Sequence, residues 1–192
     1  MGEALLEMLH EILGNSFTPE IDHAWKIVYK ALSENMIKSM NTEKLVLDSW
    51  ASLKKVENYQ EVAGGILFQS LFQKCPETKT LFGFPLELNT DSDAILQSRR
   101  FKMHSKYFIS MLDKALGMVE AKQMEENMKS LGAMHADFGV KESYFGVMKQ
   151  SLFYTLEKTL EDEWNPSLES AWSALYDRLS SQMIAAMKSA KK

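Results

Sequence analysis

Apolar residues recur at three- and four-residue spacing along most of the chain, and no run alternates strictly between apolar and polar residues. The first pattern is typical of helices with one buried face, and the second is typical of half-buried strands. Turn-forming stretches interrupt the helical pattern at Pro19, after Met40, at Pro76, from Gly83 to Asp93, from Ala136 and at Pro166. The pattern therefore predicts an all-α protein.

The beginning of the chain repeats its end. Residues 5–40 match residues 152–187 without a gap, at the offset that places Pro19 on Pro166. Helical periodicity alone does not require a shared proline, tryptophan and tyrosine, so we interpret the match as a repeat. Identical pairs include Leu5/Leu152, Leu9/Leu156, Leu13/Leu160, Ala24/Ala171, Trp25/Trp172, Tyr29/Tyr176, Leu32/Leu179, Met36/Met183, Ile37/Ile184 and Met40/Met187.

Two histidines outside this repeat are candidate ligands. His104 follows Phe101 at helical spacing and is expected in the same apolar stripe, and His135 ends a short apolar-periodic stretch. Apolar stripes of this kind more often belong to an ordinary hydrophobic core than to a cofactor site. Two imidazoles are too few for a closed zinc site, which takes four ligands. They suit an iron whose equatorial positions a porphyrin already fills, because that iron needs only one or two axial imidazoles.

An ordered set of motifs resembles the globin family, most closely its neuroglobin and cytoglobin branch, over about residues 43–187. The motifs are LVLDSW with Trp50, GGILFQSLF with Gly64 and Phe68, CPETKTLFGF with Pro76 and Phe82, MHSKYFISMLDKAL with His104, SLGAMHADFGVKESYF with His135, Val140 and Phe145, SLFYTLEK with Leu152, and AWSALY with Tyr176. Each is modest alone, but their order and spacing make the resemblance specific.

The resemblance implies a three-over-three helical sandwich around haem b, with His135 as the proximal ligand and His104 on the distal side. There His104 is either a hydrogen-bond donor to bound oxygen or itself an iron ligand, and the resemblance favours the second role, bis-histidyl, six-coordinate iron when no gas is bound. Expected cofactor contacts besides the two histidines are Phe68, Phe82, Phe84, Phe108, Leu131, Val140, Phe145 and Leu152.

Local chemistry is compatible with these roles. His135 lies in the last helical turn before Gly139, where backbone carbonyls lack helical partners. The second ring nitrogen of His135 is therefore expected to donate to a carbonyl such as that of Leu131, which leaves the other nitrogen for iron. Gly64 and Ser105 are small where two helices of this fold must cross closely.

The sequence departs from the family pattern at two distal positions. Phe108 stands where the family usually has valine, so it and Phe68 are expected to crowd an exogenous ligand, or simply to pack in the core. Tyr107 stands where relatives often have a lysine or arginine that reaches a haem propionate. Lys102 and Lys106 are candidate substitutes for that contact.

The repeat then predicts two segments: residues 1–40, which duplicate the last two globin helices, and residues 43–192, a complete haem-binding domain. Three arrangements of the first segment stay open. It is the tail of a preceding unit in a multidomain haemoglobin, a permuted element, or a hairpin that competes with residues 151–187 for one place, within or between chains.

Composition and charge restrict the classes of partner and the cellular compartment that we expect. The 22 Lys and Arg residues against 26 Asp and Glu residues give a net charge of −4, which disfavours nucleic-acid and anionic-membrane partners. The single cysteine, Cys75, excludes a disulfide within one chain, and residues 1–14 read as neither signal peptide nor membrane span. These features predict a cytoplasmic protein.

Three functions follow. The first is an intracellular globin, not a dedicated enzyme, that reversibly binds O2, CO or NO or transfers electrons or senses redox state, with a reductase, a second copy or neighbouring globin domains as partners. The second is haem redox catalysis, such as nitric-oxide dioxygenase, nitrite reductase or peroxidase chemistry. The third is a haem-free interaction module, which two histidines in family register disfavour.

Overall fold

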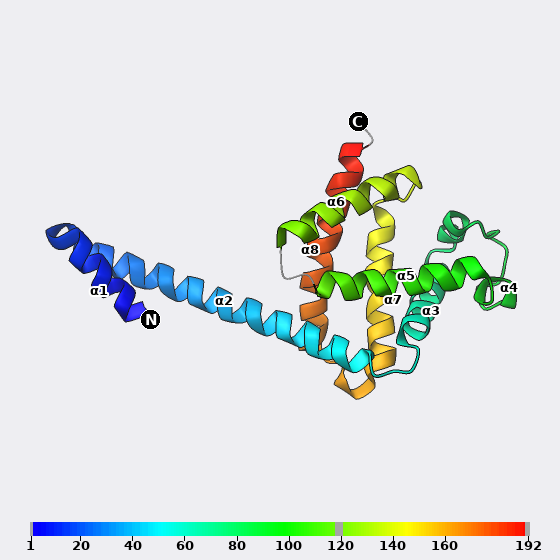
Figure 1. Cartoon of the computed structure of the whole chain (residues 1–192), viewed down its shortest axis with the longest axis horizontal. Coiled ribbons are helices and arrows are strands. Elements are labelled where there is room, and N and C mark those ends of the chain that lie inside the picture. Colours follow the sequence, from blue (N-terminus) through cyan, green and yellow to red (C-terminus); the bar gives the residue numbers. More distant parts are fainter. Residues whose placement is uncertain (1, 118–120, 191–192) are drawn as a thin grey trace. The chain divides into compact units, whose positions relative to one another are not determined.

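The computed structural model describes residues 2–117 and 121–190, and these residues contain helices and no strand (Figure 1). The all-α prediction is confirmed. The elements are α1 (Gly2–Leu13), η1 (Gly14–Ser16), α2 (Pro19–Leu53), α3 (Tyr59–Lys74), η2 (Pro76–Phe82), α4 (Asp93–Leu96), α5 (Arg99–Leu116), α6 (Ala121–Asp137), α7 (Ser143–Leu160), η3 (Glu161–Glu163) and α8 (Pro166–Ala190).

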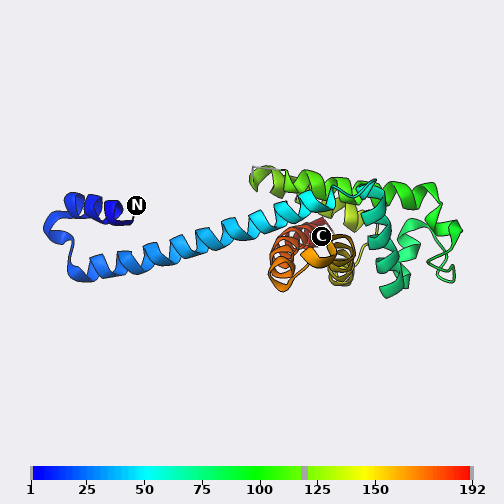
Figure 2. The same cartoon turned by 90° about the horizontal axis from the view of Figure 1, so that it is seen from below.

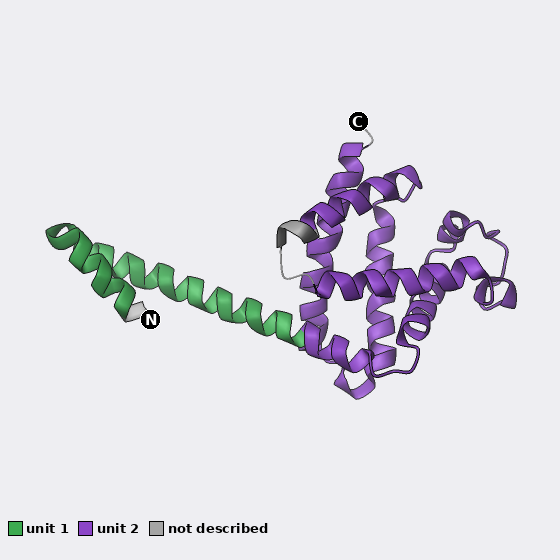
Figure 3. Cartoon of the chain, in the orientation of Figure 1, with its two compact units in different colours: residues 1–45 green, residues 46–192 purple. Residues whose placement is uncertain are grey.

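The chain divides into two compact units, residues 1–45 and 46–192, and the boundary falls inside α2 (Figure 3). The turn expected after Met40 does not form, because α2 contains no proline after its first residue and no glycine. Thr42, within this stretch, donates its hydroxyl to the carbonyl oxygen of Lys38 (2.9 Å), as a residue inside a continuous helix does.

The first unit is a helical hairpin. Its turn places Gly14 at a positive φ of 50°, and the backbone N–H of Asp22 then bonds to the carbonyl oxygen of Thr18 (3.0 Å). Pro19 is the first residue of α2, a position that tolerates proline because the first N–H of a helix has no partner to lose. Many large apolar side chains of this unit are exposed, among them Ile12, Trp25, Leu32, Met36, Ile37 and Met40.

The second unit is the predicted three-over-three sandwich. Figure 2 shows the last turns of α2 with α5 and α6 on one side of this unit, and α7 and α8 on the other. Helix α3 packs against both α5 and α7, while α6 packs against α8. The arrangement in Figure 2 places α5 and α6, the helices that carry the two candidate histidines, in one layer.

The close crossing expected between Gly64 and Ser105 is confirmed. A Cβ atom added to Gly64 of α3 would overlap the backbone carbonyl of Ser105 in α5, at 2.6 Å from its carbon. No other residue type fits there without moving one helix, so Gly64 determines how near α5 lies to α3.

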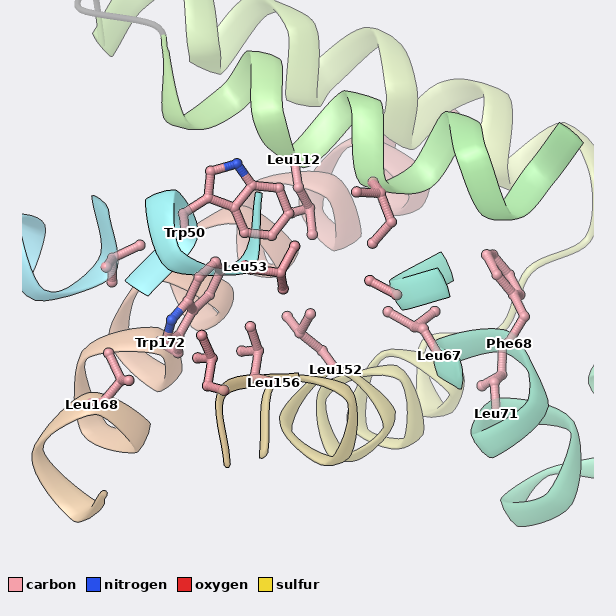
Figure 4. Close-up of a cluster of buried hydrophobic side chains, with 14 of the residues drawn as sticks. Trp50, Leu53, Leu67, Phe68, Leu71, Leu112, Leu152, Leu156, Leu168 and Trp172 are labelled. Carbon is pink, nitrogen blue, oxygen red and sulfur yellow. The ribbon is translucent and has the colours of Figure 1, made fainter. Parts of the chain in front are cut away.

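The main core lies between the last turns of α2 and helices α3, α5, α7 and α8 (Figure 4). Trp50 and Trp172 meet in it with ring centroids 5.8 Å apart. The indole N–H of Trp172 donates to the hydroxyl oxygen of Ser49 (3.0 Å), so this buried polar group has a partner. A smaller cluster of Met128, Leu179 and Met183 joins α6 to α8.

Asp113 links the start of this unit to α5. It accepts hydrogen bonds from the indole N–H of Trp50 (2.8 Å), the ammonium of Lys54 (3.3 Å) and the hydroxyl of Tyr59 (3.4 Å). The bond from Trp50, followed by those from Lys54 and Tyr59, lowers the pKa of the Asp113 carboxyl despite the opposing effect of burial.

We expect Asp113→Asn to lower the free energy of unfolding at pH 7 by about 1 kcal/mol, a modest value because the carboxylate is partly exposed. Since the pKa is lowered in the folded state, the charged form stabilises the fold above the unfolded pKa of about 3.9 and this contribution is lost as the pH falls below it. Urea unfolding should therefore show the difference between wild type and variant shrinking below about pH 4. Asp162→Asn, at an exposed site, is the control, and an undiminished difference at low pH would contradict the role given to the charge.

Candidate functional site

His135 lies in the last turn of α6, half-buried. Its Nδ1 donates to the carbonyl oxygen of Leu131, one turn earlier, at 2.8 Å. This is the hydrogen bond expected from the sequence. Because a carbonyl oxygen only accepts, Nδ1 carries the proton, and in the neutral ring Nε2 keeps its lone pair. His135 is thus held in the tautomer that suits a metal ligand.

The chain turns sharply after His135. Gly139 has a positive φ of 73°, and the N–H of Val140 bonds to the carbonyl oxygen of His135 (3.0 Å). The left-handed conformation favours glycine and ends α6 within one turn of the histidine. Val140, an expected cofactor contact, is therefore tied to His135 through the backbone.

Phe145 of α7 lies beside His135, with ring centroids 6.4 Å apart. Its carbonyl oxygen accepts a hydrogen bond from the hydroxyl of Tyr176 in α8 (2.8 Å). Burial raises the pKa of Tyr176, which stays protonated and able to donate throughout the usual pH range. Tyr176 thereby fixes the start of α7 next to the histidine.

His104 lies on α5, which begins at Arg99 and is capped by the Ser98 hydroxyl accepting from the N–H of Phe101 (3.1 Å). The buried positions of this helix are Phe101, Ser105, Ile109, Leu112 and Ala115. His104 is exposed, so its placement within the buried stripe is wrong. It stands about 100° around the helix from Ser105, at the border of the stripe.

His104 contacts one end of a chain of aromatic rings. Phe82 contacts the imidazole edge-to-face with centroids 4.8 Å apart. Phe68 touches Phe82 at 5.2 Å and Phe108 at 5.9 Å, again edge-to-face. Three of the expected contacts therefore form one cluster with His104, which we call the distal cluster: Phe68, Phe82, Phe108 and His104.

Two of the expected cofactor contacts, Phe84 and Leu152, lie outside the distal cluster. Phe84 touches Phe72, at 6.2 Å between centroids, and Phe72 in turn touches Phe82. Leu152 is fully buried within the main core. The structure thus assembles Leu131, Val140 and Phe145 around His135, and the distal cluster around His104.

The lysines considered as substitutes at the Tyr107 position differ in their contacts. The ammonium of Lys102 donates to the side-chain oxygen of Gln97 (2.6 Å), while Lys106 and Tyr107 are exposed. Lys102 is therefore engaged with the segment that precedes the first turn of α5.

Two cations that bond to the loop around Phe82 were not predicted from the sequence. Arg100 donates to the carbonyl oxygen of Phe82 (2.9 Å), beside Gly83 at a positive φ of 73°. The buried ammonium of Lys79 donates to the carbonyl oxygens of Leu86 (2.6 Å) and Leu88 (2.8 Å). Both cations satisfy backbone acceptors in a loop, a use that no periodicity reveals.

Gly132 was also missed. A Cβ atom at this position of α6 would lie 2.8 Å from Cβ of Ala186 and 3.1 Å from Cα of Met183 in α8. The absence of a side chain lets α6 approach α8 closely, three residues before His135. In the sequence, the sign of this close approach is a small residue between Leu131 and His135.

The donor set fits a haem. Within the described residues, no three or more His, Cys, Asp or Glu side chains are grouped to hold a metal ion. The two imidazoles instead lie among aromatic and aliphatic side chains, and the hydrogen bond of His135 orients its Nε2 as a free electron-pair donor. Apolar walls with one or two axial imidazoles are what an iron porphyrin requires of a protein.

A helical sandwich with these two histidine environments defines a haem-binding helical protein. The chain belongs to the globin family: the family model named Globin matches residues 66–183, more than half of the chain. As a globin it is a haem-binding protein. No helix in residues 2–117 and 121–190 is both long enough and apolar enough to cross a membrane.

Relatives in sequence include two plant proteins. Anaerobic nitrite reductase GLB0 of Physcomitrium patens is 31% identical over 153 residues, which cover 78% of this chain and 82% of the relative. Leghemoglobin 49 of Vicia faba is 30% identical over 147 residues, covering 76% of this chain and 94% of the relative.

Solved structures share the fold. A hexacoordinated haem protein from an anhydrobiotic tardigrade superimposes with a TM-score of 0.68 at 21% identity, covering 77% of this chain and 94% of its own. A Drosophila melanogaster globin superimposes with a TM-score of 0.65 at 14% identity, covering 76% and 92%. The three-over-three arrangement is thus shared well beyond recognisable sequence identity.

Proposed function

We propose that this globin holds haem b with His135 and His104 as iron ligands and reversibly binds O2, CO or NO. The observation that carries the proposal is the pair of distinct imidazole environments. One imidazole is fixed through Nδ1 to the Leu131 carbonyl oxygen, and the other is exposed and borders an aromatic cluster.

His135 is the permanent ligand in this proposal. The hydrogen bond to Leu131 fixes the tautomer of the ring and orients Nε2, while Phe145 packs against the ring. When bound, haem supplies an iron atom that takes a diatomic ligand at its sixth position.

His104 is the displaceable ligand. Its ring contact is the edge-to-face packing against Phe82 at 4.8 Å, an interaction that does not fix a ring nitrogen as the Leu131 carbonyl fixes that of His135. Such an imidazole can leave the iron at little cost in contacts inside the protein. If the iron is open about 1% of the time, the apparent gas affinity falls about 100-fold.

The test is the visible absorption spectrum of the purified protein, oxidised and then reduced under nitrogen. Split low-spin bands in both states are the expected result and indicate two imidazole ligands. A broad high-spin spectrum of the reduced protein would instead indicate an open sixth position, with His104 as a hydrogen-bond donor to the gas. Absence of haem bands even after reconstitution would contradict haem binding.

A second candidate function is reduction of nitrite. It is favoured by the name of the Physcomitrium patens relative and by that of a Gossypium hirsutum relative, also called an anaerobic nitrite reductase, which is 30% identical over 162 residues. Nitrite would need the same position on the iron that we propose for His104. Gas binding and nitrite reduction would therefore both require His104 to leave that position. An external reductase would then be a partner of the protein.

We also propose a cytoplasmic location. Cys75 is buried and unpaired, and burial raises the pKa of its thiol, so this group stays protonated and unreactive at neutral pH. Unpaired thiols are usual in a reducing compartment.

A further inference from the structure

The two copies of the repeat carry identical side chains with opposite exposure. In the C-terminal copy these side chains are core residues, whereas in the first unit they face outward along α2. The exposed fractions are 38% for Trp25 against 0% for Trp172, 64% for Met36 against 8% for Met183, and 67% for Met40 against 4% for Met187. Single exposed apolar residues are ordinary, but a continuous face of them marks an interaction site.

The structure shows what covers this face in the C-terminal copy. Trp172 packs on Trp50 and donates its indole N–H to Ser49, both in the last turns of α2. Met183 packs with Met128 of α6, and Leu131 lies against the same cluster. The last globin hairpin is therefore seated in a socket that we define as residues 46–53 of α2 and residues 128–132 of α6.

The first copy retains the features that this socket requires. Met36 and Ser39 stand at the positions of Met183 and Ala186, which Gly132 approaches closely. A serine is nearly as small as alanine, so the close crossing is preserved. Trp25 likewise keeps the indole N–H that Ser49 accepts in the other copy.

We propose that residues 5–40 form a docking hairpin whose partner is a second globin core, one that presents the same socket without its own last two helices over it. The partner surface consists of a Ser-Trp pair on a first globin helix and a glycine-bearing face of the helix that carries the proximal histidine. In a complete domain the final hairpin already fills this socket, so the docking hairpin enters only where that one is displaced or lacking.

Pairing of two docking hairpins with each other would also bury an apolar stripe. It would not account for a tryptophan and a small residue at the two positions where the socket has a serine acceptor and a glycine. The match to the socket is the more specific of the two. The docking proposal requires only the globin fold and does not depend on which histidines bind iron.

The experiment uses the chain of residues 1–192 in three forms: Met183→Asp, Met36→Asp, and both together. A buried aspartate weakens the seating of the final hairpin. We expect Met183→Asp to retain haem, because a docking hairpin takes the emptied place. The double variant should retain about one tenth as much haem, or less. Met36→Asp alone should resemble wild type.

Sedimentation velocity provides a readout independent of haem. A rise in mass for Met183→Asp that disappears in the double variant shows that the hairpin comes from another molecule. Lys38→Asp combined with Met183→Asp is the matched control, because Lys38 and its counterpart Ala185 are exposed in both copies. It should behave as Met183→Asp alone.

Equal haem retention and equal mass for Met183→Asp and the double variant would overturn the proposal. So would a wild-type dimer that Met36→Asp abolishes, because the partner would then be a second docking hairpin. If Met183→Asp yields no folded protein, Leu179→Ala with and without Leu32→Ala provides the same comparison at lower cost to the core.

Discussion

Replacing His135 with alanine is expected to abolish stable haem binding. The variant loses the imidazole whose Nδ1 is held by the Leu131 carbonyl and leaves that carbonyl without its partner. Loss of a ligand's hydrogen-bond partner alone costs about 10–100-fold in metal affinity, so loss of the ligand itself should exceed this. The measurement is the rate of haem transfer from the purified variant to an excess of an acceptor protein.

His23→Ala is the matched control, because His23 is an exposed histidine of the first unit. Addition of free imidazole to His135→Ala should restore part of the absorbance, which separates a missing ligand from a failure to fold. A variant with normal colour and normal haem retention would show that His135 is not the proximal ligand.

Replacing His104 with leucine should open the sixth iron position and raise the apparent affinity for CO, by up to about 100-fold if the open fraction in wild type is about 1%. Leucine is apolar and of similar bulk, so it maintains contact with Phe82 while removing both ring nitrogens. Stopped-flow mixing of the reduced protein with CO measures the change, because the slow phase set by imidazole departure should vanish.

Met103→Leu, one residue earlier on an exposed part of α5, is the control and should leave CO binding unchanged. Unchanged kinetics in His104→Leu would rule out His104 as the displaced ligand. The same variant informs the second candidate function, since nitrite consumption by the reduced protein should accelerate if His104 gates the iron.

The fold was largely predictable because its determinants are local or repetitive. Helical spacing of apolar residues identified the all-α class, and the small pair Gly64 and Ser105 identified a helix crossing that the structure confirms. The uninterrupted α2 was not foreseen. Asn41, Thr42 and Glu43 resemble a turn in a sequence, but polar residues inside a long helix disrupt it little when neither glycine nor proline is present.

The site was predictable where one residue's neighbours in sequence determine its surroundings. The bond from His135 to Leu131 follows from helix geometry four residues apart, and it is present. The positions of Arg100 and Lys79 depend on which loop carbonyls lie near a side chain in three dimensions, and no sequence spacing encodes that.

His104 shows a third case. Its spacing from Phe101 predicted it within the apolar stripe, yet three residues correspond to less than a full turn, so it only borders the buried positions. That border would suit the displaceable ligand that we propose His104 to be. Periodicity alone does not separate the centre of a stripe from its edge.

The contact of Gly132 with α8 extends the set of residues that position His135, the proposed proximal ligand, beyond those that line its ring. Ala186 and Met183 belong to α8, and their atoms determine how near the backbone of α6 can stand. A collection of natural variants sorted by gas affinity would therefore be read wrongly if only pocket residues were inspected. In this protein, substitutions that enlarge a side chain of α8 where it meets α6 are also expected to move the histidine.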